Sequence, residues 1–223
     1  MLGTYLLGVQ TGLAVAVPFG PLNMEISRRC LRDGWRSGFA VGLGAVTIDF
    51  LYILATGLGL APLMQHRAVT LVVFLVGGFL LGRLAWAAVK DGWESWRGRN
   101  TRAQELAALA PAGAAPEAAL RAYGIGLAMT AFSPMTIAFW ATVPQSVVFA
   151  GRVPEPREVF IVGVGVLTGC LAWVLFFTGV LSALRSRIGA RFFAAVSVAG
   201  GLLILAVALR FVWQALRMLA GAA

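Results

Sequence analysis

Six long apolar runs, separated by clusters of charged residues, constrain the fold of this 223-residue chain more than any other feature. Each run can cross the roughly 30 Å hydrocarbon core of a bilayer as a helix, which needs about 20 residues. Transmembrane β-barrels consist instead of alternating segments of about 10 residues. We therefore predict an all-α integral membrane protein with six transmembrane helices, within residues 2–27, 37–60, 68–89, 123–150, 159–182 and 192–215.

Composition excludes an ordinary soluble globule and a disordered chain. Hydrophobic residues make up 60% of the sequence and charged residues 12%, whereas soluble domains are nearer one half and one quarter, and disordered chains have low hydrophobicity. The first run lacks the basic start and the small-residue cleavage site of a signal peptide, so we expect it to be a mature span. Two cysteines, Cys30 and Cys170, make no disulfide framework.

The distribution of basic residues predicts the orientation, because cytoplasmic loops are enriched in Lys and Arg. Twelve of the 18 basic residues follow the first, third and fifth runs, and four follow the second, fourth and sixth. We therefore predict a multi-pass protein of the cytoplasmic (inner) membrane, with both termini outside and the connection 91–122 in the cytoplasm. Topology thus accounts for most of the net charge of +9, and no nucleic-acid partner is expected.

The first three runs resemble the last three, which indicates an internal repeat. Gly42, Gly44, Thr47 and Asp49 recur at identical spacing as Gly163, Gly165, Thr168 and Cys170. Because three is odd, the halves would cross in opposite directions as a 3+3 inverted-topology repeat, which is typical of secondary transporters. The repeats are assigned to 1–90 and 123–223, joined by 91–122. Chance is the alternative, since glycine is common in membrane helices.

Proline interrupts the first and fourth runs near mid-membrane. Pro18, Gly20 and Pro21 lie in the first, and Ser133 and Pro134 in the fourth. Proline removes a backbone donor, and irregular backbone at membrane depth is tolerated only within protein or beside a water-filled cavity. Paired interruptions in corresponding positions indicate a transport site. A packing kink is the alternative interpretation.

Asp49 lies near the middle of the second run, where a carboxylate costs about 2.5–3.5 kcal/mol to insert. Such a group exchanges protons or holds a cationic amine; alternatively it is a neutral acid bonded to a backbone carbonyl. Glu25, just past the first break, either lines a cavity or pairs with nearby arginines. Asn23 offers donors and acceptors to a substrate. Thr47 and Thr168 do so too, unless they bond their own helices.

We predict a substrate and ion pathway, with no catalytic residue and no metal site, from the polar and helix-breaking residues of both halves. Its members are Pro18, Gly20, Pro21, Asn23, Glu25, Thr47, Asp49, Ser133, Pro134, Thr136 and Thr168.

Four segments carry a family resemblance: Pro-Phe-Gly-Pro-Leu-Asn at 18–23, the basic turn at 28–34, the glycine-rich stretch 38–45 that leads to Asp49, and Gly-Gly-Phe-Leu-Leu-Gly at 77–82. In these segments the chain resembles the LysE/RhtB family of amino-acid exporters, and the resemblance covers nearly the whole chain. Ser133 stands where that family usually has Asn. Asp49 matches an acidic position of part of the family.

The resemblance implies a six-helix exporter of the cytoplasmic membrane, built from inverted repeats. It implies efflux of amino acids or closely related small metabolites, coupled to the proton motive force. Gly20, Pro21 and Asn23 carry over as the first-helix motif, and Pro134 as its partner. The proton gradient is the implied energy source, and no cofactor is expected.

Other functions stay open at this point. A metal-ion exporter of similar architecture would need several carboxylates or Asn at mid-membrane, which the fifth run lacks. A membrane thiol oxidoreductase is less favoured, because Cys170 matches Asp49 in the repeat and Cys30 has no counterpart. A structural or signalling subunit is a further alternative, and we do not expect an enzyme. The glycine pairs at 77–78 and 200–201 pack within one subunit or across a homodimer.

Overall fold

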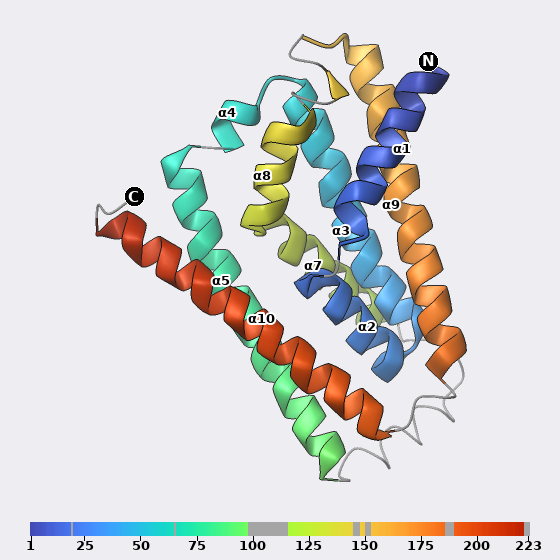
Figure 1. Ribbon diagram of the computed structural model, residues 1–223, viewed down its shortest axis with the longest axis vertical. Helices are drawn as coiled ribbons and strands as arrows, with labels where there is room; N and C mark the ends of the chain where they lie inside the picture. The colour runs from blue at the N-terminus through green and yellow to red at the C-terminus, as the bar shows by residue number, and fades with distance from the viewer. Residues whose placement is uncertain are drawn as a thin grey trace.

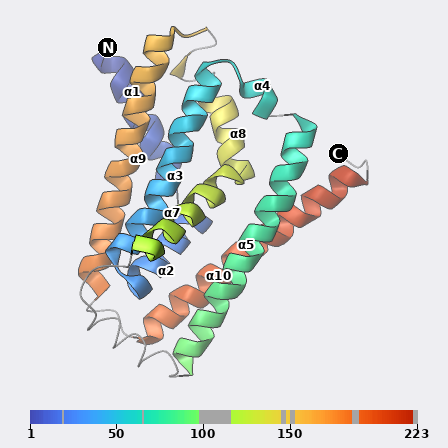
Figure 2. The ribbon, with the colours of Figure 1, turned by 180° about the vertical axis from the view of Figure 1, so that it is seen from behind.

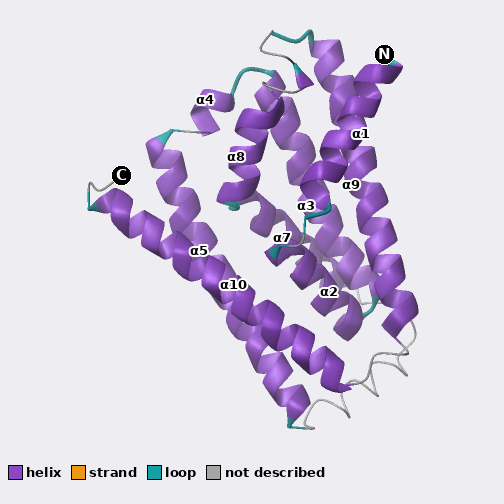
Figure 3. Cartoon of the chain, viewed as in Figure 1, coloured by secondary structure: helices purple, strands orange, loops and turns teal. Residues whose placement is uncertain are grey.

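The computed structural model describes residues 1–18, 20–64, 66–97, 116–144, 148–149, 153–185 and 190–220. These residues are mainly helical, and the described part of the chain contains no strand (Figure 3). Much of the predicted connection 91–122, namely 98–115, lies outside the described residues. The helices are α1 (Leu2–Ala16), α2 (Pro21–Asp33), α3 (Trp35–Gly57), α4 (Ala61–Met64), α5 (Arg67–Trp96), α7 (Pro116–Ala131), α8 (Pro134–Val143), α9 (Pro156–Arg185) and α10 (Ala190–Leu219).

Four helices, α3, α5, α9 and α10, are each long and apolar enough to cross a membrane. Two further pairs meet that criterion only when combined: α1 with α2, bent by 77°, and α7 with α8, bent by 60°. The described residues therefore supply four spans, or up to six if each bent pair is one span. The predicted all-helical, multi-span architecture agrees with these helices.

The helices form a compact group and a separate crossing pair (Figures 1 and 2). In both views α1, α3 and α9 run alongside one another, with α2 and α7 near one end of this group. α5 and α10 cross each other to one side, and each packs mainly on the other. Within the group, α1 packs on α9, and α3 packs on both α7 and α9. The bent pairs thus lie against the long helices α3 and α9.

Glycines allow α1 and α9 to approach closely. A Cβ atom at Gly8 or Gly12 of α1 would meet the backbone of Val162 or Val166. On α9, a Cβ atom at Gly169 would meet the carbonyl oxygen of Val9. Small residues spaced four apart are the usual means of close helix contact in membranes. This contact holds α9 next to the end of α1, where the chain breaks.

The longest helices extend beyond the apolar runs that predict them. The run 68–89 is contained in α5, which continues through Lys90, Asp91 and Glu94 to Trp96. An apolar run reflects the thickness of the hydrocarbon core, whereas backbone hydrogen bonding continues into the polar interface. The extension matters because it carries Asp91 alongside α2.

Candidate functional site

The break between α1 and α2 is held by one side chain. α2 begins at Pro21, directly after the extended residue Gly20, and proline is well suited to the first helical position. The carboxamide nitrogen of Asn23 donates to the carbonyl oxygens of Ala16 and Pro18, at 3.0 and 2.9 Å. Carbonyl groups at the end of a helix lack intrahelical donors. Asn23, which is buried on α2, therefore supplies a donor to two carbonyl groups on the α1 side of the break.

The break between α7 and α8 has a local cap instead. Ser133 is the N-cap residue of α8, and its Oγ accepts from the backbone nitrogen of Thr136 at 3.3 Å. Pro134 occupies the first helical position. Serine at the N-cap satisfies one of the donors left free at a helix start. At both breaks the following helix therefore begins at a proline, but a different polar side chain stabilises each break.

Asp49 is a buried carboxyl group held between two helices. Asp49, on α3, is 6% exposed. The indole nitrogen of Trp140, on α8, donates to Oδ1 at 2.8 Å. The thiol of Cys170, on α9, lies 4.0 Å from Oδ2 and also 3.3 Å from the carbonyl oxygen of Gly12. The carboxyl group therefore lies where α1, α3, α8 and α9 meet.

A small cavity of about 40 Å³ adjoins this carboxyl group, with walls from α1, α2, α3, α7, α8 and α9. Asp49 is the only charged residue among the described residues that line it. The lining side chains able to form hydrogen bonds are Asn23, Asp49, Thr130, Thr136, Cys170 and Trp173. We call this space the Asp49 cavity. It brings three of the predicted pathway residues, Asn23, Asp49 and Thr136, to one place.

Two polar atoms of this lining have no hydrogen-bond partner among the described residues. They are the hydroxyl oxygen of Thr130, on α7, and the indole nitrogen of Trp173, on α9. Both atoms are buried. Buried polar groups are nearly always paired, so an unpaired one needs an explanation. The pathway predicted from the sequence includes neither residue.

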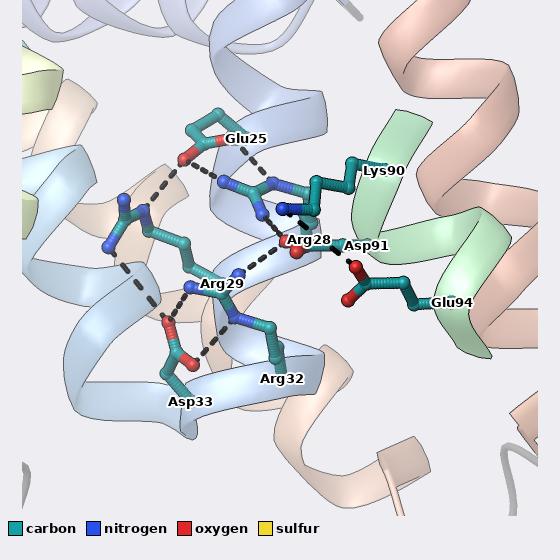
Figure 4. A network of polar contacts seen from close by, with 8 residues as sticks. All are labelled: Glu25, Arg28, Arg29, Arg32, Asp33, Lys90, Asp91 and Glu94. Atoms are coloured by element: carbon teal, nitrogen blue, oxygen red, sulfur yellow. Dashed lines mark hydrogen bonds and ion pairs between the residues drawn. The ribbon is translucent and has the colours of Figure 1, made fainter. Parts of the chain in front are cut away.

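Glu25 lies in a network of ion pairs rather than in the lining of the Asp49 cavity (Figure 4). Its side chain is fully buried and accepts from Arg28 at 2.8 Å and from Arg29 at 2.7 Å. Asp91 of α5 in turn binds both Arg28 and Arg32 of α2. We call the set Glu25, Arg28, Arg29, Arg32, Asp33 and Asp91 the α2–α5 ion-pair network. It joins the crossing pair α5–α10 to the rest of the protein.

Thr47 and Thr168 are also absent from the lining of the Asp49 cavity. The Thr47 hydroxyl donates to the carbonyl oxygen of Leu43 at 2.9 Å and accepts from the Tyr123 hydroxyl at 3.0 Å. The Thr168 hydroxyl donates to the carbonyl oxygen of Val164 at 2.8 Å. Both hydroxyls therefore bond to their own helices. No group of three or more potential metal-ligating side chains occurs in the part of the chain that the structure describes.

The chain is similar to a known family and to two named proteins. The sequence model of the LysE type translocator family matches residues 13–215. The "Putative amino acid efflux protein YcgF" of Bacillus subtilis is 22% identical over 218 residues, which cover 97% of this chain and 99% of that protein. The "Chemotactic transduction protein ChpE" of Pseudomonas aeruginosa is 27% identical over 212 residues, covering 93% and 97%. No solved structure matches the chain.

Proposed function

The chain belongs to the LysE type translocator family, and on that basis we propose that this multi-pass membrane protein is a secondary exporter of amino acids or closely related small metabolites. The observation that carries the proposal is the buried Asp49 carboxyl group, beside a cavity that both bent helix pairs line. Intramembrane carboxyl groups commonly mark substrate or proton pathways. The similarity to a protein named for amino acid efflux supports the choice of cargo.

The proposed architecture is a 3+3 inverted repeat, with repeats 1–90 and 123–223 and with the first and fourth spans interrupted at the helix breaks. Under this assignment α1–α2 corresponds to α7–α8, α3 to α9, and α5 to α10. The packing of α1 on α9 then has its counterpart in the packing of α7 on α3. Glycines support both contacts, since a Cβ atom at Gly126 would meet the carbonyl oxygen of Val41 as one at Gly12 meets that of Val166.

Transport would proceed by alternating access around the Asp49 cavity. Its volume of about 40 Å³ is far below the roughly 300 Å³ of a small-molecule site. The conformation described here therefore corresponds to a contracted state in the proposed cycle. Substrate would enter when the half-helices α2 and α8 move relative to α3 and α9, since both half-helices contribute to the lining.

Proton coupling would involve Asp49, which would hold a proton or the amino group of the substrate in alternation. The proton gradient would then supply the energy, with no cofactor required. We place the protein in the cytoplasmic membrane with both termini outside, because this orientation puts the arginine-rich segment 28–36 and the end of α5 on the cytoplasmic side.

Efflux from intact cells tests this function. Cells that lack their own amino-acid exporters are loaded with a mixed amino-acid pool, with and without the protein, and the medium is analysed by mass spectrometry. We expect one or a few amino acids to appear in the medium only with the protein, and an uncoupler to abolish their release. If the protein is present in the membrane and no amino acid appears in the medium, the proposal is wrong.

A further inference from the structure

We propose that Thr130 and Trp173 bind the carboxylate of a neutral aliphatic amino acid whose amino group is held by Asp49. The inference rests on the proposed export of amino acids and names the substrate class and two specificity-determining residues. It follows from the unpaired donors of the Asp49 cavity, from the fixed position of one of them, and from the charges of the lining.

The hydroxyl of Thr130 differs from those of most helical threonines among the described residues. Seven threonines donate to the carbonyl oxygen four residues earlier: Thr11, Thr47, Thr56, Thr70, Thr142, Thr168 and Thr178. Thr130 lies in the last turn of α7, where the same bond is available to it. It is 4% exposed, and its hydroxyl has no partner among the described residues. Its side chain lines the Asp49 cavity instead.

Trp173 offers a second unused donor with a fixed ring. Its indole stacks on Phe177, with ring centroids 5.6 Å apart and an angle of 8° between the planes. Its Nε1 is buried and has no partner in the described residues, whereas the Nε1 of Trp140 is bonded to Asp49. Leaving a buried donor unpaired is energetically unfavourable. A ligand acceptor that reaches Trp173 would remove that cost.

The two donors and the carboxyl group of Asp49 complement the two ends of an α-amino acid. The Asp49 carboxylate would accept a hydrogen bond from the ammonium group of the substrate, because a buried charge requires a partner of opposite charge. Thr130 and Trp173 would donate to a carboxylate, and hydrogen bonds to an ionised acceptor are stronger than neutral ones. The described lining offers no Lys or Arg for the carboxylate, so neutral donors must perform this role.

The remaining lining residues of the Asp49 cavity determine which type of substrate side chain it can accept. They are aliphatic and include Val15, Ala16, Leu22, Ile26, Val46 and Val174. With Asp49 used by the amino group, the described lining holds no second charged residue that could pair with a basic or acidic side chain. An unpaired buried charge is strongly unfavourable. The cavity therefore favours a neutral aliphatic amino acid over lysine, arginine or glutamate.

Binding measurements with matched ligands test this inference. The purified protein in lipid nanodiscs is equilibrated with tritium-labelled L-valine or with labelled isobutylamine, which retains the amine and aliphatic chain of valine but lacks the carboxylate. Thr130→Val and Trp173→Phe each remove one donor. We expect each to weaken valine binding by about ten-fold and to change isobutylamine binding by less than about two-fold. Thr130→Ser, which keeps the hydroxyl, should keep valine affinity.

Control variants separate this role from a general loss of structure. Thr178→Val removes a buried hydroxyl that is bonded within its own helix, and Trp213→Phe alters an indole on α10 that is 62% exposed. Neither should change the binding of either ligand. An equal loss of both ligands in Thr130→Val and Trp173→Phe, or no loss, would overturn the inference. So would strong displacement of valine by lysine or glutamate.

The outcomes also separate this inference from the proposed function. If the cells export a basic or acidic amino acid and the protein does not bind valine, the exporter function stands and the carboxylate assignment is wrong. If the cells export no amino acid, the proposed function itself fails. Size-exclusion profiles of each variant establish that a binding loss does not come from misfolding, and Trp173→Phe, which removes the other donor, supplies the test if Thr130→Val is not folded.

Discussion

The indole nitrogen of Trp140 donates to Oδ1 of Asp49 at 2.8 Å, joining α8 to α3 across 91 positions of sequence. Trp140 is fully buried and belongs to the apolar cluster around α3 and α9. The half-helix after the second break is therefore attached directly to the carboxyl group that we place at the centre of transport. Any movement of α8 away from α3 must break this bond.

Trp140→Phe should destabilise the protein, because it leaves a buried carboxyl oxygen without its donor. The expected loss in the free energy of unfolding is about 1–3 kcal/mol, measured by denaturation of the purified protein in mixed micelles. Trp213→Phe is the matched control, since that indole is largely exposed on α10, and should change stability by less than about 0.5 kcal/mol. Equal stability of Trp140→Phe and the wild type would contradict the importance of this bond.

Asp49→Asn should abolish export while leaving membrane insertion normal. The amide has nearly the same shape and can still accept from Trp140, but it cannot carry the negative charge that the proposed cycle requires. The measurement is efflux from loaded cells, with the amount of protein in the membrane determined in parallel. Normal efflux by this variant would eliminate the proposed role of Asp49.

Ser133→Ala should remove the cap of α8 and cost about 1 kcal/mol of unfolding free energy. Ser133→Asn is the informative companion, because asparagine caps helices as well as serine does and is the residue usual at this position in the family that the sequence resembles. We expect Ser133→Asn to retain both stability and export. If both variants lose the same stability, the hydrogen bond from the Thr136 nitrogen is not the cause.

Asp91→Asn should weaken the attachment of α5 to α2. Asp91 accepts from Arg28, which is almost completely buried, and from Arg32, and losing hydrogen bonds to charged groups costs about 1.5–3 kcal/mol. Glu94→Gln is the control on the same helix, because Glu94 is half-buried and pairs at 3.9 Å with the exposed Lys90, an interaction worth about 0–1 kcal/mol. The measurement is the thermal unfolding of both variants. An equal loss of stability in the two would contradict the expectation that the Asp91 interactions are the stronger ones.

Gly169→Ala and Gly179→Ala should have opposite effects, although both lie on α9. A Cβ atom at Gly169 would meet the carbonyl oxygen of Val9 on α1, whereas one at Gly179 meets nothing within 4 Å. Alanine is the better helix former by about 1 kcal/mol. Gly179→Ala should therefore be neutral or stabilising, and Gly169→Ala destabilising. The measurement is the free energy of unfolding of each variant. If Gly169→Ala stabilised the protein, α1 and α9 could separate at little cost.

The starts of α2 and α8 could be predicted because their causes are local. Pro21 and Pro134 determine where α2 and α8 begin, and the capping serine directly precedes Pro134. The pairing of Glu25 with Arg28 and Arg29 is equally local, since these residues are three and four positions apart on α2. It was one of two interpretations that the sequence allowed.

The contacts around Asp49 could not be predicted, because they join distant segments. Nothing near Trp140 in an apolar run indicates that its indole reaches a carboxyl group on α3. Thr130 has the same sequence environment as threonines that bond their own helices, so its unpaired hydroxyl becomes visible only in the packed structure. The sequence places Asp91 in a connection, because an apolar run does not show how far a helix continues past the hydrocarbon core, whereas the structure places it in α5.

The two hydrogen bonds from Asn23 affect how the joint between α1 and α2 can move. Both are made by one nitrogen atom, to oxygens of Ala16 and Pro18 that lie on the far side of the break. A small change of angle would strain both bonds together, and a large one would release both together. We therefore expect the joint to switch between discrete angles rather than to bend gradually, so that the half-helix α2 moves as a rigid rod about Gly20.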